Sequence, residues 1–280
     1  MKIGMVCYPT YGGSGIVATE LGIEMARRGH EVHFISYSMP MRLDSFQENI
    51  FFHEVEFPHY PLFEFHLYSL ALTGKIIEVA KYEGIEILHV HYAIPHAVSG
   101  ILSKMILDED IRLKVITTLH GTDITLVGLE PGFMPIVRFS LGQSDMLTAV
   151  SEHLRQKTIQ NFSSKKEIRV LPNFVETNIY KRLECPKIKN QLAPDGEKIL
   201  IHISNFRSVK RVTDTVRILA EVIKHHPARL VLVGDGPDRS ETERLARELG
   251  IIEYVRFLGK QTAVVELLSC ADIFLLPSQA

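Results

Sequence analysis

Short apolar runs rich in β-branched residues alternate along the chain with longer stretches of helical periodicity. In the first part, strands are expected at 2–7, 32–36, 87–91, 114–119 and 146–150, and helices at 16–28, 69–82, 96–107 and 151–161. The segment 40–61 is less regular, and we expect one strand and a loop there. Strands that alternate with helices are typical of βα units, so the sequence predicts an α/β fold with mostly parallel sheets.

The same rhythm pauses and then restarts in the second part of the chain. Residues 181–196 are polar, contain prolines and lack periodicity, as inter-domain links do. Beyond them, strands are expected at 199–204, 230–233, 255–258 and 273–276, with helices at 212–225, 239–249 and 263–268. The sequence therefore predicts two domains of similar construction, 1–172 and 173–280.

The last expected strand, 273–276, is apolar throughout, so we expect it to be buried. Only PSQA follows it. A buried strand in such a domain needs a helix to cover it. We therefore expect the second domain to be incomplete and the chain to be a fragment of a longer protein.

Charge and cysteine content limit the class of protein. The 280 residues include 31 Lys and Arg against 33 Asp and Glu, a formal net charge of -2, so no broad basic surface is expected to bind nucleic acid or an anionic membrane. Three cysteines are scattered along the chain, which favours free thiols and a reducing compartment. There is no cleavable leader pattern and no apolar stretch of about 18 residues, so the expected location is the cytoplasm.

A glycine-rich turn, YGGSG at 11–15, lies between the first strand and the first helix. Gly13, Gly15 and Ala18 match the dinucleotide-binding pattern G-x-G-x-x-A, but the second strand ends in HFISYSM, without an acidic residue to hold a ribose. A nicotinamide or flavin enzyme is therefore a minor alternative. Phosphate binding by N–H groups at the helix N-terminus remains. The plainer alternative is a tight turn in which Gly15 lets the helix pack on the sheet.

Histidines follow two of the expected strands. His89, His91 and His96 lie in LHVHYAIPH, and His120 and Asp123 lie in TLHGTD. The H-x-H spacing, completed by His120 or Asp123, resembles a zinc-ligand set, so a metal-dependent hydrolase is the alternative function. Hydrogen-bonded core histidines and a helix-capping aspartate are the simpler interpretation, because no HExxH motif or cysteine pair supports a metal.

Charged residues gather at two further connections. Arg207, Lys210 and Arg211 follow a strand and precede a helix in ISNFRSVKRVTD. Three cations beside a helix N-terminus suit a diphosphate without a metal, and a solvated basic turn is an equal alternative. The acidic run 108–110 instead connects a helix to the next strand, so we expect a solvated turn at the opposite edge of the sheet.

Taken together and in order, these segments resemble the retaining GT-B glycosyltransferases of family four. The resemblance spans nearly the whole chain and is carried by GGSG, TLHGTD, AVSEHL, VLPNFVE, SNFRSVKR, LVLVGDGPD, VRFLG and ADIFLLPS. YPTYGGSG, HYAIPHA and NFRSVKR are most similar to the subgroup that transfers N-acetylglucosamine from UDP to L-malate in bacillithiol biosynthesis. The resemblance implies two Rossmann-like domains facing each other across a cleft, with the acceptor held mainly by 1–172 and the nucleotide sugar mainly by 173–280.

The resemblance also implies a role for each candidate residue. Gly13, Ser14 and Gly15 approach the donor diphosphate; Arg207 holds it with Lys210 or Arg211; His120 is catalytic at the sugar; Leu258, Gly259 and Lys260 lie beside the nucleobase; Tyr92, Thr118 and Arg138 bind the acceptor. Arg138 is the one basic group in an apolar helical stretch, which suits a buried carboxylate partner, and a surface arginine is the alternative.

The implied donor is UDP-N-acetylglucosamine and the implied acceptor is L-malate, with no metal or other cofactor and no nucleic-acid or membrane partner. A homo-oligomer is compatible with the resemblance. Attack on the same face of the sugar, with the departing phosphate accepting the malate hydroxyl proton, is the implied chemistry. Two features depart from the family. Phe174 stands where most members have glycine, and the paired-glutamate motif E-x7-E would begin directly after PSQA, so this chain is expected to bind donor weakly and to turn over little.

Overall fold

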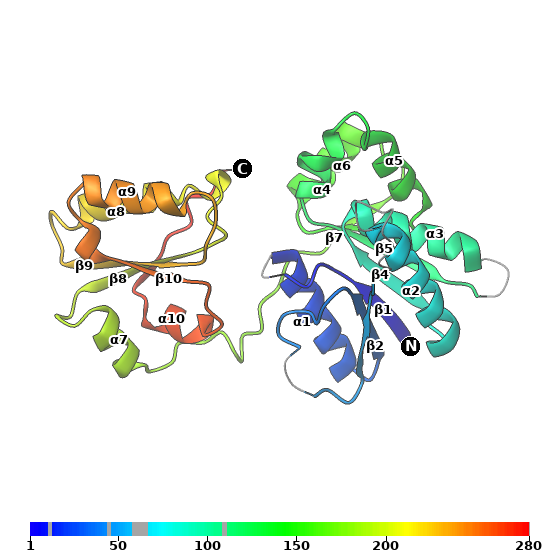
Figure 1. Ribbon diagram of the computed structural model, residues 1–280, viewed down its shortest axis with the longest axis horizontal. Coiled ribbons are helices and arrows are strands. Elements are labelled where there is room, and N and C mark those ends of the chain that lie inside the picture. Colours follow the sequence, from blue (N-terminus) through cyan, green and yellow to red (C-terminus); the bar gives the residue numbers. More distant parts are fainter. Residues whose placement is uncertain (11–12, 44–45, 58–66, 108–110, 280) are drawn as a thin grey trace. The chain divides into compact units, whose positions relative to one another are not determined.

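The computed structural model describes residues 1–10, 13–43, 46–57, 67–107 and 111–279. Its internal contacts separate two compact units, Met1–Phe174 (unit 1) and Val175–Ala280 (unit 2) (Figure 1). The acidic run 108–110, which the sequence predicts to be a solvated turn, lies outside the described residues. Among the described helices, none is long and apolar enough to cross a membrane.

Unit 1 is built on a parallel sheet in the order β3-β2-β1-β4-β5-β6-β7. Its strands are β1 Lys2–Val6, β2 Glu31–Ser36, β3 Ile50–Glu54, β4 Ile87–His91, β5 Lys114–Leu119, β6 Met146–Ala149 and β7 Ile168–Val170. The predicted strands are confirmed to within a residue at each end, and β3 falls inside the irregular segment. The short edge strand β7 was not predicted.

Helices connect the strands of unit 1. They are α1 Gly13–Arg27, α2 Tyr68–Glu83, η1 Ala93–Ala97, α3 Val98–Leu107, α4 Thr122–Thr125, η2 Val127–Leu129, α5 Met134–Gln143 and α6 Glu152–Phe162. Local chemistry sets several of their ends. The Ser151 hydroxyl accepts the Leu154 N–H at the start of α6, and α2 ends at Gly84 in the left-handed conformation.

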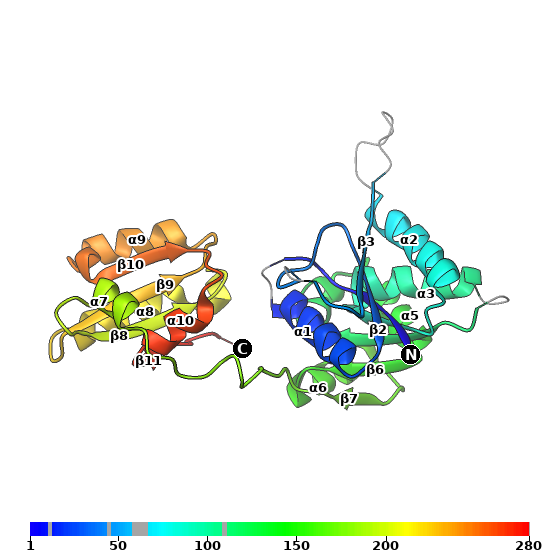
Figure 2. The same cartoon turned by 90° about the horizontal axis from the view of Figure 1, so that it is seen from below.

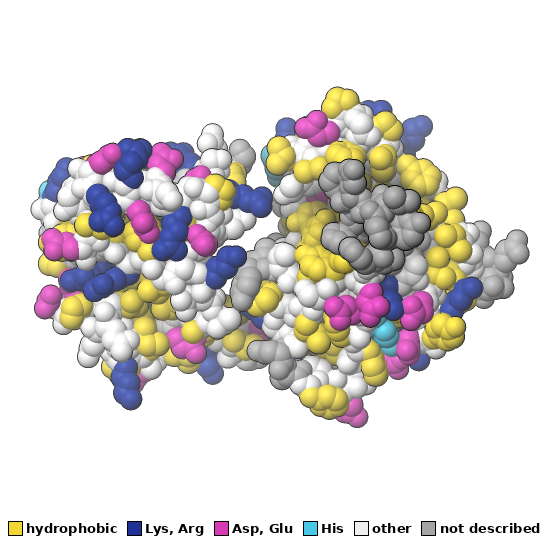
Figure 3. All heavy atoms as spheres, viewed as in Figure 1, with side chains coloured by type: hydrophobic (Ala, Val, Ile, Leu, Met, Phe, Trp, Pro, Cys, Tyr) yellow, Lys and Arg dark blue, Asp and Glu magenta, His cyan; other side chains and the backbone are white. Residues whose placement is uncertain are grey.

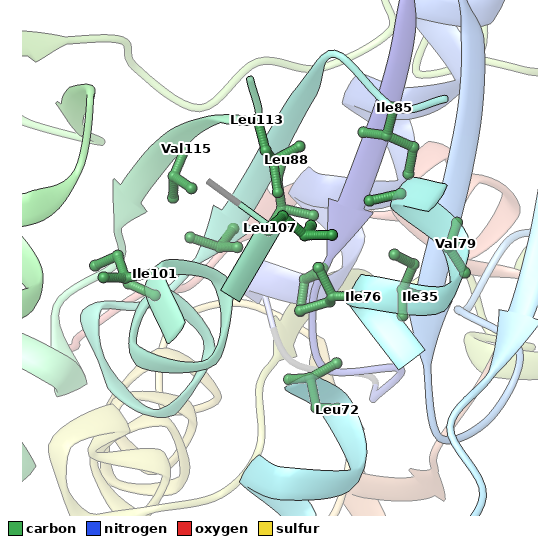
Figure 4. Close-up of a cluster of buried hydrophobic side chains, with 14 of the residues drawn as sticks. Ile35, Leu72, Ile76, Val79, Ile85, Leu88, Ile101, Leu107, Leu113 and Val115 are labelled. Atoms are coloured by element: carbon green, nitrogen blue, oxygen red, sulfur yellow. The ribbon is translucent and has the colours of Figure 1, made fainter. Parts of the chain in front are cut away.

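The core of unit 1 lies on both faces of its sheet. On one face, Leu72 and Ile76 of α2 and Ile101 of α3 pack against Leu88 and Val90 of β4 (Figure 4). On the other face, α1 covers a cluster that includes Met5 and Phe34. Because side chains alternate along a strand, the histidines of β4 point away from the Leu88 face. The polar residues of the strand ends therefore share the α1 side of the sheet.

Unit 2 repeats this construction with four parallel strands, in the order β10-β9-β8-β11 (Figure 2). They are β8 Lys198–Ile203, β9 Ala228–Val233, β10 Val255–Gly259 and β11 Ile273–Phe274. The helices are α7 Pro186–Leu192, η3 Ser208–Lys210, α8 Val212–Val222, α9 Arg239–Glu248, η4 Ile252–Tyr254 and α10 Val264–Cys270. α8 and α9 cover one face, and α7 and α10 cover the other (Figure 1).

Two expectations for unit 2 were wrong. The segment 181–196, expected to be an inter-domain link, contains α7, which buries Leu192 against Ile199 and Leu267 in unit 2. The apolar strand β11 is not buried, because it lies at the edge of the sheet and pairs only with β8 among the described strands. Ile273 and Phe274 remain 53% and 47% exposed.

A tight contact between two turns fixes the strand ends of unit 2. Gly234, directly after β9, has a φ of 121°, and a Cβ there would overlap the carbonyl oxygen of Ser204 after β8. The Gly234 N–H donates to the Gly259 carbonyl at the end of β10, at 2.7 Å. Glycine is therefore required both by backbone conformation and by space.

We expect Gly234→Ala to lower the free energy of unfolding of unit 2 by at least about 2 kcal/mol, because it adds steric overlap to left-handed strain. Gly196→Ala is the matched control, since Gly196 also has a positive φ (78°) but open space around its Cβ position. That variant should lose only about 1 kcal/mol. Urea unfolding followed by circular dichroism measures both, and equal losses would contradict the steric argument.

Candidate functional site

Unit 1 offers a binding position where β1 and β4 end. From β1 the chain continues to β2, toward one edge of the sheet, and from β4 it continues to β5, toward the opposite edge. Ligands of α/β sheets bind at such a switch point, beyond the carboxyl ends of the strands. The loop after β1 carries Tyr8 and leads to Ser14, and Tyr92 follows β4 directly.

Ser14, Tyr92 and His120, three of the predicted site residues, come together there. The Ser14 hydroxyl donates to the Tyr92 hydroxyl oxygen at 2.8 Å, and the Tyr92 and His120 rings lie 5.2 Å apart. Tyr92 has a φ of 90°, a conformation that side chains other than glycine rarely adopt. Its N–H donates to the Thr118 carbonyl at 2.9 Å, which holds this backbone against β5. The strained conformation aims the Tyr92 ring at the helix that begins with Gly13.

The two described glycines of the glycine-rich turn have different surroundings. Gly15 is buried, and a Cβ there would overlap the Tyr8 carbonyl oxygen, so this glycine lets α1 pack closely on the turn. Gly15 thus has a packing role, as the plainer alternative proposed, but the close contact is with the turn after β1 and not with the sheet. Gly13 is exposed with open space around it. Gly13 begins a 15-residue helix, whose first N–H groups lack intrahelical partners.

Asp123 fastens the ends of β4 and β5 to each other. Its carboxylate accepts the N–H of Ala93 at 2.9 Å, of Gly121 at 3.0 Å and of His120 at 3.3 Å, and the residue is 2% exposed. Burial raises the pKa of Asp123, and these three N–H donors oppose the rise. The aspartate thus shapes the His120 turn and is not itself presented to a ligand.

The histidines of β4 form a stacked column with His120. The His91 Nδ1 and His120 Nε2 atoms share a hydrogen bond of 2.8 Å, and the His89 ring stacks on His91 with a centroid distance of 4.6 Å. Thr118 bonds to His89 Nε2 at 2.7 Å and to the Thr148 hydroxyl at 2.6 Å. The Thr118 hydroxyl is therefore already hydrogen-bonded within unit 1, where Thr118 supports the column.

Burial keeps this column neutral. It lowers the pKa of His89 and of His120 to about 4, and that of His91 well below its ordinary value, with a further contribution from the neighbouring imidazoles. At neutral pH each ring therefore carries one proton. His120 differs from the other two because it is partly exposed.

The column does not have the geometry of a metal centre. Two nitrogens that bind one tetrahedral zinc ion stand about 3.3 Å apart, since each Zn–N bond is about 2.0 Å. The shared hydrogen bond of His91 and His120 is shorter, at 2.8 Å. Among the described residues, the group whose ligand atoms converge is Glu31, His33 and Glu83, on other elements, and there Lys2 already pairs with Glu31. The strand-end histidines therefore do not support the hydrolase alternative.

Unit 2 places its three predicted cations after β8 in unequal surroundings. The Arg211 guanidinium donates to Asp214 at 2.6 Å, and Arg211 takes the left-handed conformation at the start of α8. Arg207 is exposed, Lys210 is half-buried, and neither has an ion-pair partner among the described residues. The Lys210 charge adds to burial in lowering the pKa of His202 on β8, so this ammonium lies near the strand end. Elsewhere on the visible face of unit 2, basic and acidic side chains are interspersed (Figure 3).

The turns after β9 and β10 meet the turn after β8. The Asp238 N–H donates to the Phe206 carbonyl at 3.0 Å, and Gly236 leaves no room for a Cβ against the Asn205 carbonyl. Gly259, with a φ of 68°, accepts the Gly234 N–H. Through these contacts, the predicted nucleobase segment 258–260 is linked by the turn after β9 to the turn after β8, which carries the cations.

Arg138 lies in a different environment from the one expected. Only Val137, Ser140 and Leu141 of α5 are buried, whereas Arg138 is exposed beside Phe139, which is 45% exposed. The apolar character of this stretch therefore did not indicate burial. α5 packs against η1, the segment that follows Tyr92, so Arg138 belongs to the same end of unit 1.

Sequence reasoning missed two features of this site. His91 was considered as a metal ligand or a hydrogen-bonded core histidine, but not as the direct partner of His120. Tyr8 was not considered, although its ring lies 4.4 Å from the His96 ring and 5.6 Å from the Tyr92 ring. A tyrosine two residues after the end of β1 and three residues before the glycine-rich turn at 11–15 was the available signal.

Comparisons with known proteins agree for both units. Residues 11–179 match the family model described as Glycosyltransferase Family 4, and residues 186–280 match Glycosyl transferases group 1. The chain is 46% identical over all 280 residues to an N-acetyl-alpha-D-glucosaminyl L-malate synthase from Bacillus anthracis, of which it covers 73%. It is 25% identical to an alpha-monoglucosyldiacylglycerol synthase from Streptococcus pneumoniae, with 92% of this chain and 61% of that protein covered.

Solved structures show the same architecture. Anabaena HepE in complex with UDP and glucose superimposes with a TM-score of 0.76 at 19% identity, covering 100% of this chain and 75% of that one. A glycosyltransferase from Rickettsia africae gives the same TM-score, with 99% and 73% covered. The fold is therefore the GT-B arrangement of two Rossmann-like units. With a family model matching more than half of its residues and a relative 46% identical along its whole length, the chain belongs to glycosyltransferase family 4.

Proposed function

We propose that this glycosyltransferase moves N-acetylglucosamine from UDP-N-acetylglucosamine to the hydroxyl of L-malate, with retention of anomeric configuration. The observation that carries the proposal is the 46% identity to the Bacillus anthracis synthase, because it extends through both units. HepE, which shares the fold, binds UDP and UDP-glucose, and this supports a UDP-sugar as the donor. We place the enzyme in the cytoplasm, in keeping with its three free cysteines.

On this proposal, Arg207 and Lys210 hold the donor diphosphate. Both lie at the carboxyl end of β8, and neither charge is used by an acidic partner among the described residues. Arg211, the third candidate, is committed to Asp214. The pair would stabilise the negative charge that grows on the departing UDP, and the α1 N-terminus at Gly13 and Ser14 would contribute N–H donors.

The acceptor would meet the strand ends of unit 1. Tyr92 and Ser14 already share one hydrogen bond, so their hydroxyls are placed to bind a hydroxyl-bearing acceptor. Arg138 supplies an exposed guanidinium for a malate carboxylate. Attack occurs on the face from which UDP departs: the malate oxygen bonds to the anomeric carbon, the bond to the phosphate oxygen breaks, and that oxygen takes the malate proton. Segment 258–260 would lie beside the nucleobase.

Release of UDP from UDP-N-acetylglucosamine by the purified enzyme tests the reaction. We expect release with L-malate, and at most about a tenth of that rate with D-malate, inositol phosphate or water, because a hydrogen-bonding site rejects mismatched polar groups. Equal rates with water and L-malate would show a hydrolase, and a preference for inositol phosphate would reassign the acceptor. Measurement with and without a chelator also tests the prediction that no metal is needed.

Replacement of the unit 2 cations separates their roles. Arg207→Ala and Lys210→Ala should each lower kcat by about 100-fold, the usual loss when a donor to developing transition-state charge is removed. Arg211→Asn keeps a residue that tolerates the left-handed conformation, and it should cost less than about 5-fold. Arg217→Ala is the control, because Arg217 also pairs with Asp214 but lies on α8. A loss for Arg211→Asn as large as for Arg207→Ala would reverse the assignment.

Arg138→Ala should raise the KM for malate by about 10- to 100-fold and leave the KM for the donor within about 2-fold, since a charge-assisted bond to one substrate is lost. Arg169→Ala, another exposed arginine of unit 1, is the matched control. If the donor KM rises more than the malate KM, Arg138 does not bind the acceptor.

A further inference from the structure

The hydrogen bond between His91 and His120 has a direction, and we infer that His91 is its donor and thereby fixes the tautomer of His120. The Nδ1–H of His91 donates to Nε2 of His120, so His120 carries its own proton on Nδ1. This assignment stands independently of the reaction. Its meaning for catalysis rests on the proposed function.

Each ring has a single proton to place. Both imidazoles are neutral at pH 7, as burial dictates, and a neutral imidazole has one N–H donor and one acceptor nitrogen. The bond joins Nδ1 of His91 to Nε2 of His120 at 2.8 Å. Either Nδ1 of His91 or Nε2 of His120 carries the shared hydrogen. The ring that accepts the hydrogen bond must then carry its own proton on its other nitrogen.

The far nitrogen of His91 decides between the two directions. His91 Nε2 is buried and has no hydrogen-bond partner among the described residues. If His91 accepted the bond from His120, its proton would sit on Nε2, and a buried N–H would be left without an acceptor. If His91 donates, the unpartnered atom is a bare acceptor. Buried N–H groups without partners are the rarer case in proteins, so the donating arrangement is favoured.

Polar groups around His91 are already committed to other bonds. His96 Nδ1 faces the His91 carbonyl at 2.6 Å, and because a carbonyl only accepts, His96 must be protonated there. Its Nε2 then accepts from the Tyr68 hydroxyl at 2.9 Å. His89 Nε2 is used by Thr118. These bonds use both nitrogens of His96 and Nε2 of His89, and among the described residues none is made to Nε2 of His91.

For His120 the consequence is a fixed donor. Its Nε2 accepts from His91, its Nδ1 carries the proton, and Nδ1 has no partner among the described residues of this half-buried ring. His120 can then donate a hydrogen bond to an oxygen of the bound sugar, but it has no free lone pair to act as a base. His91 is accordingly a positioning residue, and the malate proton is left to the departing phosphate.

Nuclear magnetic resonance reads the tautomer directly. Protein made with 15N-labelled histidine, studied at pH 7.5 without substrates, should show His120 protonated at Nδ1 and bare at Nε2 in long-range proton–nitrogen spectra. His120→Gln identifies the resonances by their disappearance. A His120 ring protonated at Nε2 in the wild-type protein would overturn the inference without any further variant.

His91→Phe keeps a planar ring but removes the donor. We expect His120 to become a mixture of tautomers and kcat to fall by about 10-fold, with the KM for malate within about 2-fold. His89→Asn is the control for the tautomer alone, because His89 stacks on the His91 ring and bonds to Thr118 instead of to His120, so the His120 tautomer should stay unchanged. An unchanged tautomer in His91→Phe, or an equal shift in His89→Asn, would refute the positioning role. Absence of transfer by a wild-type protein with the expected tautomer would instead reject the proposed function alone.

Discussion

The Asp123 carboxylate holds the functional end of unit 1 together. One buried side chain gathers N–H groups from the turn after β5 and from Ala93, just beyond β4. These turns have no strand ladder to satisfy their backbone donors, and a buried donor without a partner costs about 1–3 kcal/mol. The three hydrogen bonds to Asp123 fix the position of the His120 ring. They also hold the start of η1 next to Tyr92 and its positive φ.

In unit 2, close contact between backbone segments takes the place of a buried polar side chain. There the strand-end turns approach so closely that Gly234 and Gly236 leave no space for side chains. The turns after β8, β9 and β10 contact one another through their backbones. Arg207 and Lys210 extend from the turn after β8. Unit 1 thus builds its strand end from polar side chains, whereas unit 2 builds its own from bare backbone with Arg207 and Lys210 added.

The order of strands and helices could be predicted from the sequence. Strands buried on both faces are continuous apolar runs, and they alternate with segments of helical periodicity. The sequence was insufficient where burial depends on sheet order. β11 has the composition of a central strand, yet it is the last of the four strands described in unit 2 and is half exposed. The pairing of His91 with His120 was also beyond reach, because it requires the register in which His91 lies opposite Thr118. Composition likewise could not show that α5 exposes Arg138, since a helix with few buried positions can still be apolar.

The close contact at Gly234 also limits how this protein could be altered. Since no side chain fits at Gly234, substitution there cannot change this end of unit 2 without moving the turns after β8 and β9 apart. Variation is left to exposed positions beside it, such as Asn205 and Asp235. Among proteins with this turn, differences in donor preference are therefore expected to come from the side chains that surround Gly234 and Gly236. The two glycines themselves offer only backbone groups.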